Sequence, residues 1–570
     1  MTPPEAPPPA ASAVSAASGL RGPRLLAAAL VVFLGLTTAV TWPQVPRLRD
    51  GIADIGDPLL NAWALAWVAH ELPSAPARLF DANIFHPERG TLAYSETLLA
   101  PALLGAPFFW LGAGPVGVYN LLLVLGIAAS GVGMAALVHD LTGRRGAALV
   151  AGAIFAFLPF RFDHYSHFQL LQTQWMPLAL WFLHRLVDRG RVGDGVGLGV
   201  MVGLQVMTSV YNAIFLAALL AVVGPVLIAW RGLSVARLRA IGVSVVVAAV
   251  LSTPVAIAHL KARAVVGERG RDEAARMSAE LTDYLAAVPW NRLHGGRAER
   301  FGAIERRLFP GVVVVVLALV ALWPPLSGPR LAYALGVLVT VELSRGFNGW
   351  LYPWLYDHAF LLRSLRVPAR MGLVVGLALS VLAGFGAARL QARWSSRTGA
   401  AAVIVLLLGV LADSWVAPIG LTIVPHAVPE VYADMMRDRG DSTDVPFVRP
   451  MHARQPDVLL ELPMNTEVPT YMYYSTYHWQ TLVNGYSGFF SDRYNRVGQV
   501  MLSFPDEGAI KLLRSLSVRY LAVHGEFMAP RDYSRLTTTL DRMAPTFRLV
   551  SRHPWKDAEI SLYRVETRPR

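Results

Sequence analysis

The sequence predicts a polytopic α-helical membrane protein with about eleven transmembrane helices, followed by a small α/β domain outside the membrane. Three observations lead to this fold class. The chain of 570 residues is 54% hydrophobic and only 16% charged, too little polar surface to cover a soluble core of that size. Apolar runs close to the ~20 residues that a bilayer demands recur up to about residue 418. Residues 421–570 instead contain short stretches that alternate apolar and polar side chains, as strands do.

Charge and cysteine usage exclude several other classes. The formal net charge of +12 would point to nucleic acid in a soluble chain. Here most Arg residues lie between apolar runs, as they do in the cytoplasmic loops of membrane proteins, so we expect no nucleic-acid partner. The sequence contains no Cys, which excludes disulfides, thiolate metal sites and cysteine nucleophiles.

The amino terminus predicts a cytoplasmic tail and an anchor. Residues 1–20 are mostly Pro, Ala and Ser, and we expect them to be disordered. Arg21 and Arg24 then precede an apolar run from Leu25 to about Trp42. The run is long for a signal peptide and no small-x-small cleavage site precedes Trp42, so we expect an uncleaved anchor with its basic end inside.

The number of spans depends on how the segment Leu98 to Gly114 is interpreted. It is apolar but short and broken by Pro, which favours a re-entrant or surface-lying piece. Counting it as a span gives the alternative of twelve helices and moves Arg144 and Arg145 outside, against the usual charge distribution. The outer loop is then 43–97, and the ten spans after the first are expected at about 116–138, 146–160, 170–187, 195–210, 212–230, 238–258, 310–325, 329–344, 370–390 and 400–418.

This topology divides the chain into three parts. They are the tail 1–20, a transmembrane module 21–420 and an extracytoplasmic α/β domain 421–570. In the last part, strands are expected at 457–462, 517–523 and 560–565, with an amphipathic helix from Glu507 to Leu516.

The polar stretch 50–97 contains the first candidate functional residue. Asp57 and Pro58 predict a helix start, because a carboxylate accepts from free amides and Pro needs no amide partner at the first helical position. The following helix has an apolar, Trp-bearing face and is expected to lie along the membrane surface, with Asp57 as its cap. Asp50 and Asp54 are interpreted as solvated loop acids.

A second outer loop carries Asp163, His164 and His167. Asp163 and His167 are four residues apart, so a helical start would put them on one face, beside the loop of Asp57. Three interpretations remain open: a divalent metal site with oxygen and nitrogen ligands, a carboxylate that acts as general base, or a hydrogen-bonding surface patch.

Two further stretches suggest substrate binding. Arg363, Arg366 and Arg370 stand at the outer membrane boundary, where forked guanidinium donors suit a lipid phosphate; the alternative is that they are snorkelling anchors. Trp479 and Tyr486 belong to an aromatic-rich stretch suited to stacking on sugar rings. The alternatives there are an aromatic strand in the domain core or a segment resting on the membrane interface.

Together these segments resemble the GT-C glycosyltransferases, membrane enzymes that take a sugar from a polyprenyl-phosphate carrier on the outer face. The resemblance implies that Asp57 is the catalytic base and Asp163 a second carboxylate, and that Arg366 and Arg370 hold the carrier phosphate. Arg363, His164 and His167 join the expected substrate-binding residues. The first loop has Asp54-x-x-Asp57 in place of an Asp-x-Asp pair, and the Trp-Trp-Asp-Tyr-Gly motif of oligosaccharyltransferases is absent.

The resemblance also sets the expected partners. They are a polyprenyl-phosphate-linked sugar and a glycan, lipid or protein acceptor at the bacterial cell envelope, with no cofactor required if Arg stabilises the leaving phosphate. Two other classes remain. A transporter or flippase of a lipid-linked substrate would place its site near the midplane, often in repeated halves, and a non-enzymatic envelope scaffold would tolerate replacement of Asp57 or Asp163.

Overall fold

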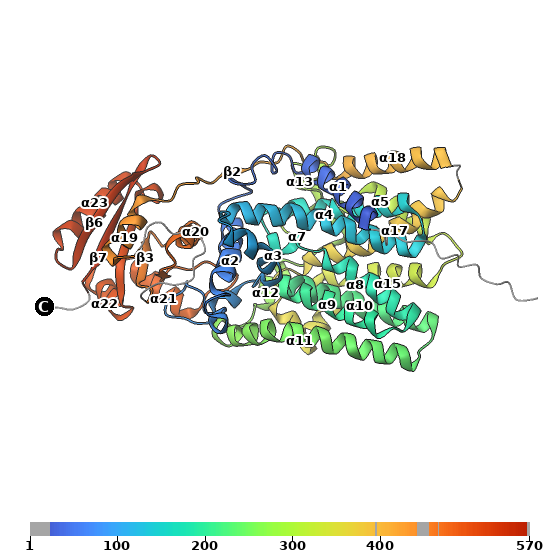
Figure 1. Ribbon diagram of the computed structural model, residues 1–570, viewed down its shortest axis with the longest axis horizontal. Coiled ribbons are helices and arrows are strands. Elements are labelled where there is room, and N and C mark those ends of the chain that lie inside the picture. The colour runs from blue at the N-terminus through green and yellow to red at the C-terminus, as the bar shows by residue number, and fades with distance from the viewer. Residues whose placement is uncertain (1–22, 394–395, 442–454, 465–466, 567–570) are drawn as a thin grey trace, which may run out of the picture.

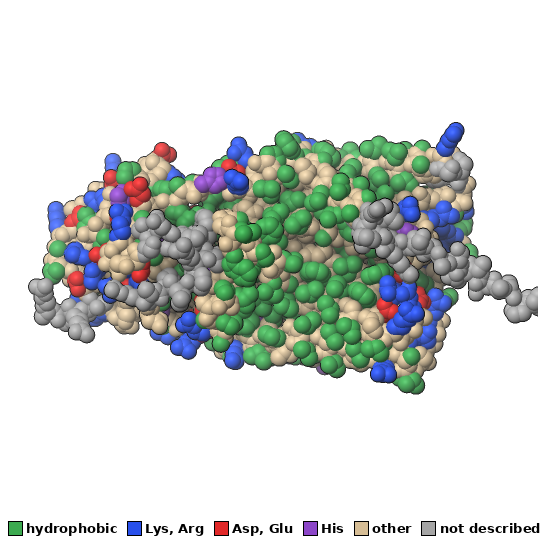
Figure 2. All heavy atoms as spheres, in the orientation of Figure 1, with side chains coloured by type: hydrophobic (Ala, Val, Ile, Leu, Met, Phe, Trp, Pro, Cys, Tyr) green, Lys and Arg blue, Asp and Glu red, His purple; other side chains and the backbone are tan. Residues whose placement is uncertain are grey.

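The structure, a computed structural model, describes residues 23–393, 396–441, 455–464 and 467–566. A helical bundle is followed by a domain built on a β-sheet, which packs against one end of the bundle (Figure 1). Figure 2 shows apolar side chains over the middle of the bundle and Lys and Arg side chains towards its two ends. An apolar band between charged ends is what a bilayer requires of a protein that it surrounds, and the chain is an integral membrane protein.

Each of the eleven apolar runs expected to span the membrane forms a helix. Among the described residues, six helical segments are long and apolar enough to cross a membrane: 115–142, 145–163, 210–231, 235–266, 368–391 and 397–414. The figure of eleven crossings therefore stays a prediction. The eleven helices are α1 (Pro23–Val40), α4 (Pro115–Thr142), α5 (Arg145–Ala156), α8 (Trp175–Arg189), α9 (Val192–Thr208), α10 (Val210–Arg231), α11 (Val235–Val266), α14 (Val312–Leu322), α15 (Gly328–Ser344), α17 (Gly372–Gln391) and α18 (Ser396–Ser414).

The segment expected to be re-entrant or surface-lying forms helix α3 (Leu99–Trp110). Its 12 residues rise only about 18 Å, well short of the ~30 Å hydrocarbon core of a bilayer. Short helices and turns connect the longer ones. They are α6 (Pro159–Asp163), α7 (Phe168–Leu171), α12 (Arg271–Arg276), α13 (Ala298–Phe301) and α16 (Leu351–His358), with the 3₁₀ turns η1 (Pro76–Arg78), η2 (Thr91–Tyr94), η3 (Leu281–Leu285), η4 (Gly295–Arg297), η5 (Gly346–Asn348), η6 (Phe360–Ser364), η7 (Pro368–Met371) and η8 (Gly525–Phe527).

The sheet domain has five strands in the order β4-β3-β5-β7-β6. Strand β3 is parallel to β4 and β5, whereas β7 is antiparallel to β5 and β6. The three strands and the amphipathic helix expected from the sequence are all present. The strands are β3 (Val458–Leu462), β4 (Thr481–Leu482), β5 (Val518–His524), β6 (Phe547–Trp555) and β7 (Ala558–Val565), and the helices are α19 (Glu430–Arg439), α20 (Val468–His478), α21 (Asp492–Met501), α22 (Glu507–Ser515) and α23 (Pro530–Arg542).

One interpretation of the aromatic stretch before β4 is wrong. It forms helix α20, not a strand, and the helix ends at Trp479, whose φ of 49° is left-handed. A second, two-stranded sheet joins β1 (Gly51–Ile52) to β2 (Thr422–Ile423), so the outer loop pairs with the segment that follows α18.

Helix α2 (Asp57–Glu71) lies between the bundle and the sheet domain. Every residue from Pro58 to Glu71 is buried, and the helix packs against α3, α4 and α20. The apolar face expected from the sequence is therefore only part of the buried surface, because protein covers the helix on every side. Trp63 and Leu65 are two residues apart and so lie on nearly opposite sides of the helix, yet both are fully buried. A helix that is hydrophobic all round is buried all round.

Ring stacking and backbone hydrogen bonds hold the sheet domain against α2. The Trp479 indole stacks on His70 with ring centroids 4.2 Å apart and packs against Trp67 at 5.8 Å. Nearby, the backbone N–H of Phe85 donates to the Asn484 carbonyl at 3.1 Å, extending the sheet edge into the outer loop. Trp479 is only 3% exposed, so this indole is part of the interface core.

We expect Trp479→Ala to destabilise the packing of the sheet domain against the bundle. Truncating a buried Trp costs about 3–5 kcal/mol, because the cavity left behind loses both transfer energy and contacts. The matched control is Trp350→Ala, since Trp350 is 74% exposed. In detergent, the first variant should unfold at a temperature several degrees lower than the control; equal midpoints would contradict the assignment of Trp479 to the core.

Candidate active site

A cavity of about 820 Å³ opens at the end of the bundle that faces the sheet domain. Its walls come from helix ends and loops rather than from the middle of any long helix. Asp57 begins α2, Tyr211 stands in the first turn of α10, and Val266 ends α11. Because side chains at helix ends are fixed by the packing of the whole helix, such a cavity is preorganised by the bundle.

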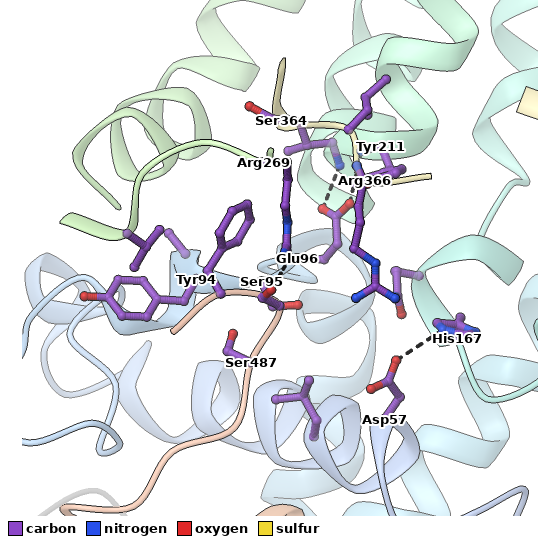
Figure 3. A pocket seen from close by; sticks show the side chains of 18 of the residues that line it. Asp57, Tyr94, Ser95, Glu96, His167, Tyr211, Arg269, Ser364, Arg366 and Ser487 are labelled. Atoms are coloured by element: carbon purple, nitrogen blue, oxygen red, sulfur yellow. Dashed lines mark hydrogen bonds and ion pairs between the residues drawn. The ribbon is translucent and has the colours of Figure 1, made fainter. Parts of the chain in front are cut away.

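The carboxylate of Asp57 points into this cavity (Figure 3). Its Oδ2 lies 3.5 Å from Nε2 of His167, and its Oδ1 accepts a hydrogen bond from the Tyr486 hydroxyl at 3.2 Å. Pro58 occupies the first turn of α2 as expected, but Gly56 is the N-cap and makes no side-chain capping bond. The predicted capping role of Asp57 is therefore wrong. The carboxylate is 25% exposed and free to meet a ligand.

Behind Asp57, Arg370 and Glu305 form a buried ion pair. The Arg370 guanidinium donates two hydrogen bonds to the carboxylate, from Nε at 2.9 Å and from a terminal nitrogen at 2.6 Å. Burial alone would raise the pKa of Glu305, but the charge and hydrogen bonds of Arg370 outweigh it and hold that pKa well below its usual range. Glu305 has a left-handed φ of 71°, a conformation that bulky residues adopt only when their surroundings impose it.

Two imidazoles complete this cluster. His164 lies 3.5 Å from Glu305, and His167 lies 3.2 Å from a terminal nitrogen of Arg370. Burial lowers the pKa of His164 well below its usual range, and burial followed by the charge of Arg370 lowers that of His167. Both rings are therefore neutral at pH 7, and neither neutralises the charge of Asp57.

His164, His167 and Glu305 could together hold a metal ion, since one ligand atom from each lies within 4.8 Å of the others. Two imidazoles and a carboxylate suit Zn²⁺ or Mn²⁺. However, both Glu305 oxygens already accept from Arg370, which also contacts His167. The guanidinium supplies the positive charge where an ion would sit, so in this arrangement the residues do not fit a metal.

Two further arginines line the cavity, and Figure 3 shows the Arg366 side chain extending towards Asp57, whereas that of Arg269 extends towards the loop 485–490. Arg366 is 40% exposed, and its Nε lies 3.7 Å from Glu273, beyond hydrogen-bond distance. Arg269 lies 3.6 Å from the same Glu273, and its Nε is buried with no hydrogen-bond partner among the described residues. Unpaired buried donors are rare in folded proteins, so this guanidinium is ready to receive an anion.

The sheet domain closes the cavity with the loop 485–490. The Arg269 guanidinium donates to the carbonyl of Gly488 and lies over the Phe489 ring, 3.9 Å from its centre. Burial, followed by the charge of Asp57, raises the pKa of Tyr486 to about 12. The hydroxyl consequently keeps its proton at neutral pH and donates it to Asp57.

The remaining predicted site residues lie elsewhere. Asp163 accepts from Arg307 at 2.7 Å with a side chain only 2% exposed, and it is not among the residues that line the cavity. Arg363 donates outside the cavity to the carbonyls of Tyr356 and Asp357. Trp479 is buried against α2, which leaves no face of its ring for a sugar.

Some residues of the site were not anticipated. Glu305 and Arg269 belong to the long segment between α11 and α14, which has no recognisable motif. Asp54, interpreted as a solvated acid, lines the cavity and accepts from Ser166. Glu96 also lines it, but its carboxylate accepts from the backbone N–H groups of Val210 and Tyr211 and so caps α10.

Comparison with known proteins identifies the fold. No protein-family model matches the chain, and no curated protein resembles it significantly in sequence. Among solved structures, the arabinofuranosyltransferase AftD from Mycobacteria is similar over 96% of this chain, with a TM-score of 0.62 and 16% identity, and its R1389S mutant has a TM-score of 0.59. The chain spans 40% of the length of AftD. The chain therefore has the GT-C fold that its sequence suggested.

Two other solved structures are less similar. The oligosaccharyltransferase of Archaeoglobus fulgidus in complex with Zn and sulfate has 14% identity and a TM-score of 0.49, covering 89% of this chain and 69% of its own. ArnT from Cupriavidus metallidurans has 14% identity and a TM-score of 0.46, and the similarity covers 95% of this chain and 98% of the ArnT chain.

The pairing of Arg370 with Glu305 leads to a prediction about metals. Arg370→Gln should bind Zn²⁺ at least ten times more tightly than the unmodified protein in calorimetric titration. The reason is that Glu305 would be left as an uncompensated buried carboxylate, which a cation stabilises. Adding His164→Ala should remove the gain. Tight binding by the unmodified protein would show that the guanidinium does not block the site.

Proposed function

We propose that the protein is a membrane glycosyltransferase that moves a sugar from a polyprenyl-phosphate carrier to a hydroxyl group of an envelope glycan, lipid or protein. One observation carries the proposal. The Asp57 carboxylate shares a cavity with the guanidinium groups of Arg269 and Arg366, which have donors to spare. A carboxylate to remove a proton and cations to receive a phosphate are what this reaction needs. The GT-C fold agrees with it.

In the proposed reaction, Asp57 takes the proton of the acceptor hydroxyl as its oxygen bonds to the anomeric carbon. The bond between that carbon and the phosphate oxygen breaks, and its electron pair stays on the phosphate. Arg366 and Arg269 stabilise the negative charge that develops there. The products are the glycosylated acceptor and the polyprenyl phosphate, and no step calls on a metal ion.

The shape of the cavity supports a lipid-linked donor. Ile214 of α10 and Val266 of α11 line the cavity, and large apolar side chains such as Leu260 are exposed on α11. An isoprenoid chain could leave the cavity between these helices and enter the hydrocarbon of the bilayer, while its phosphate stays beside the arginines.

Two residues have supporting roles in this proposal. Tyr486 orients the carboxylate of Asp57 through its hydrogen bond at 3.2 Å. Asp163 is a positioning residue, because its ion pair with Arg307 holds the loop that carries Glu305. We assign the acceptor contacts to the loop 485–490 and to His167. We assign the contacts with the carrier phosphate to Arg366, and Arg370 lies deeper, where it contacts His167.

The proposed orientation follows from charge. Arg-bearing loops such as Arg144 with Arg145, and Arg189 with Arg191, lie at the end of the bundle opposite the sheet domain, and such loops face the cytoplasm. We therefore propose a cytoplasmic amino terminus in the plasma membrane, with residues 421–570 and the cavity outside. A transporter is less well supported, because its site would lie at the midplane between broken helices, whereas this cavity opens at helix ends.

Replacing the proposed base should abolish transfer. Asp57→Asn keeps the size of the side chain and can still accept from Tyr486, but it cannot take a proton, so the rate of sugar transfer should fall by about 10²–10⁴-fold. Asp50→Asn is the matched control, because Asp50 pairs with Arg47 outside the cavity.

The measurement is a mass-spectrometric profile of envelope glycans and lipid-linked sugars in strains that contain either variant or no copy of the chain. We expect Asp57→Asn to lack one sugar and to accumulate its lipid-linked donor, and Asp50→Asn to match the unmodified protein. Normal glycans with Asp57→Asn would favour a scaffold or a transporter.

A second pair of variants tests the phosphate contact. Arg366→Gln should weaken binding of a short-chain polyprenyl phosphate by about tenfold or more, because it removes a charged, forked donor. Arg363→Gln should leave binding unchanged, since that guanidinium bonds to carbonyls outside the cavity. Equal effects of both substitutions would show that they act through the membrane surface charge rather than through a site.

A further inference from the structure

A second cavity, of about 1070 Å³, runs along the membrane-embedded part of the bundle. We call it the α4–α8 groove, because α4 and α8 form its two long walls and α1 and α3 close it from the side. It follows α4 from Leu122 to Asp140, which at 1.5 Å per residue is about 27 Å. One lipid of a bilayer leaflet extends over about half of the ~40–45 Å membrane, so a whole lipid fits within this length.

The α4–α8 groove is apolar along most of its course and basic at one end. Leu125, Ala129 and Leu178 line its middle. At the end of α8 it is lined by Arg189 and Arg191, both exposed and without an ion pair among the described residues. Asp140 also reaches this end, but a single carboxylate leaves the arginines in excess. Arg185 is already paired with Asp194 at 2.8 Å.

Trp181, which lines the α4–α8 groove, has a polar atom without a hydrogen-bond partner among the described residues. The Nε1 of Trp181 is buried and donates no hydrogen bond among the described residues. Trp181 stands about two helical turns, or 12 Å, from Arg189 along α8. A glycerophospholipid carries ester carbonyls on the membrane side of its phosphate, and these are the acceptors that an indole N–H at this depth could use.

The α4–α8 groove is separate from the candidate active site. His167, Gln169 and Leu170 line the active-site cavity, whereas Gln172 and Gln174 line the groove. The segment 168–174 therefore stands as a wall between the two. A carrier chain that leaves the active-site cavity between α10 and α11 would not enter this groove.

We propose that the α4–α8 groove binds one anionic glycerophospholipid. Its phosphate rests on Arg189 and Arg191, an ester carbonyl accepts from Trp181, and an acyl chain follows α4 and α8 towards Gln174. Three features favour this lipid: the basic end of the groove, an apolar channel as long as a lipid, and the unpaired indole donor of Trp181. The assignment does not depend on the proposed transfer reaction, and its test needs no sugar substrate.

The test is photo-crosslinking of the full-length protein in detergent with phosphatidylglycerol that carries a diazirine on one acyl chain. Mass spectrometry should place the crosslinks on residues 122–140 and 174–189. Unlabelled phosphatidylglycerol should compete them away. Competition of equal strength by a polyprenyl phosphate, which has no ester carbonyl, would overturn the assignment to a glycerophospholipid, as would crosslinks that lie mainly on other helices.

Matched variants separate the site from general membrane affinity. Arg189→Gln with Arg191→Gln should lower crosslinking at least fivefold, whereas Arg144→Gln with Arg145→Gln, exposed at the same end of the bundle, should not. Ala129→Trp should block the groove, with Ala401→Trp on the exposed face of α18 as control. Trp181→Phe should remove the preference for ester-linked over ether-linked phosphatidylglycerol. Unchanged crosslinking in both the double Arg variant and Ala129→Trp would overturn the proposal.

Discussion

Burial of α2 on every side is the constraint on which the rest of the site depends. The helix sits between α3 and α4 of the bundle and α20 of the sheet domain, so its first residue cannot move unless both parts move. Asp57 is that residue, and its carboxylate is left in the cavity because Gly56, not Asp57, caps the helix. The sheet domain is thus part of the site, because Trp479 packs against α2 and Tyr486 donates a hydrogen bond to the carboxylate of Asp57.

Electrostatics divide the site into a neutralised layer and an active one. In the deeper layer, Arg370 and Glu305 cancel each other, and burial keeps His164 and His167 neutral. In the layer that faces the cavity, the Asp57 carboxylate lies beside Tyr486 and His167, and Arg366 and Arg269 have donors that no described protein group uses fully. A sugar phosphate between them would meet a proton acceptor on one side and a phosphate receptor on the other. This division explains why Glu305, which together with His164 and His167 resembles a metal site, pairs with the guanidinium of Arg370 instead of an ion.

The sequence was most informative where a local pattern determines the outcome. Apolar runs predicted the helices, and Asp-Pro predicted the start of α2. The role expected of Arg366 and Arg370 stays a prediction, although both residues line the cavity that contains Asp57. The errors arose where tertiary contacts decide. The sequence around Asp57 does not show that the hydroxyl of Tyr486, more than 400 residues later, donates a hydrogen bond to its carboxylate. Glu305 and Arg269 lie in loops, and their roles depend on contacts with residues distant in the sequence. Glu305 pairs with Arg370, and Arg269 donates to the carbonyl of Gly488. Trp479 could not be recognised as buried from the sequence, because its ring packs on His70 and Trp67 of α2, and that contact forms only in the folded protein.

The measurement that tests the account most directly is a cryo-EM structure of the protein with a non-transferable phosphonate analogue of a polyprenyl-phosphate sugar. The account predicts that the phosphonate lies against Arg269 and Arg366, that the anomeric carbon faces Asp57, and that the isoprenoid leaves between α10 and α11. A phosphonate bound away from these arginines, or a sugar on the far side of the cavity from Asp57, would contradict it.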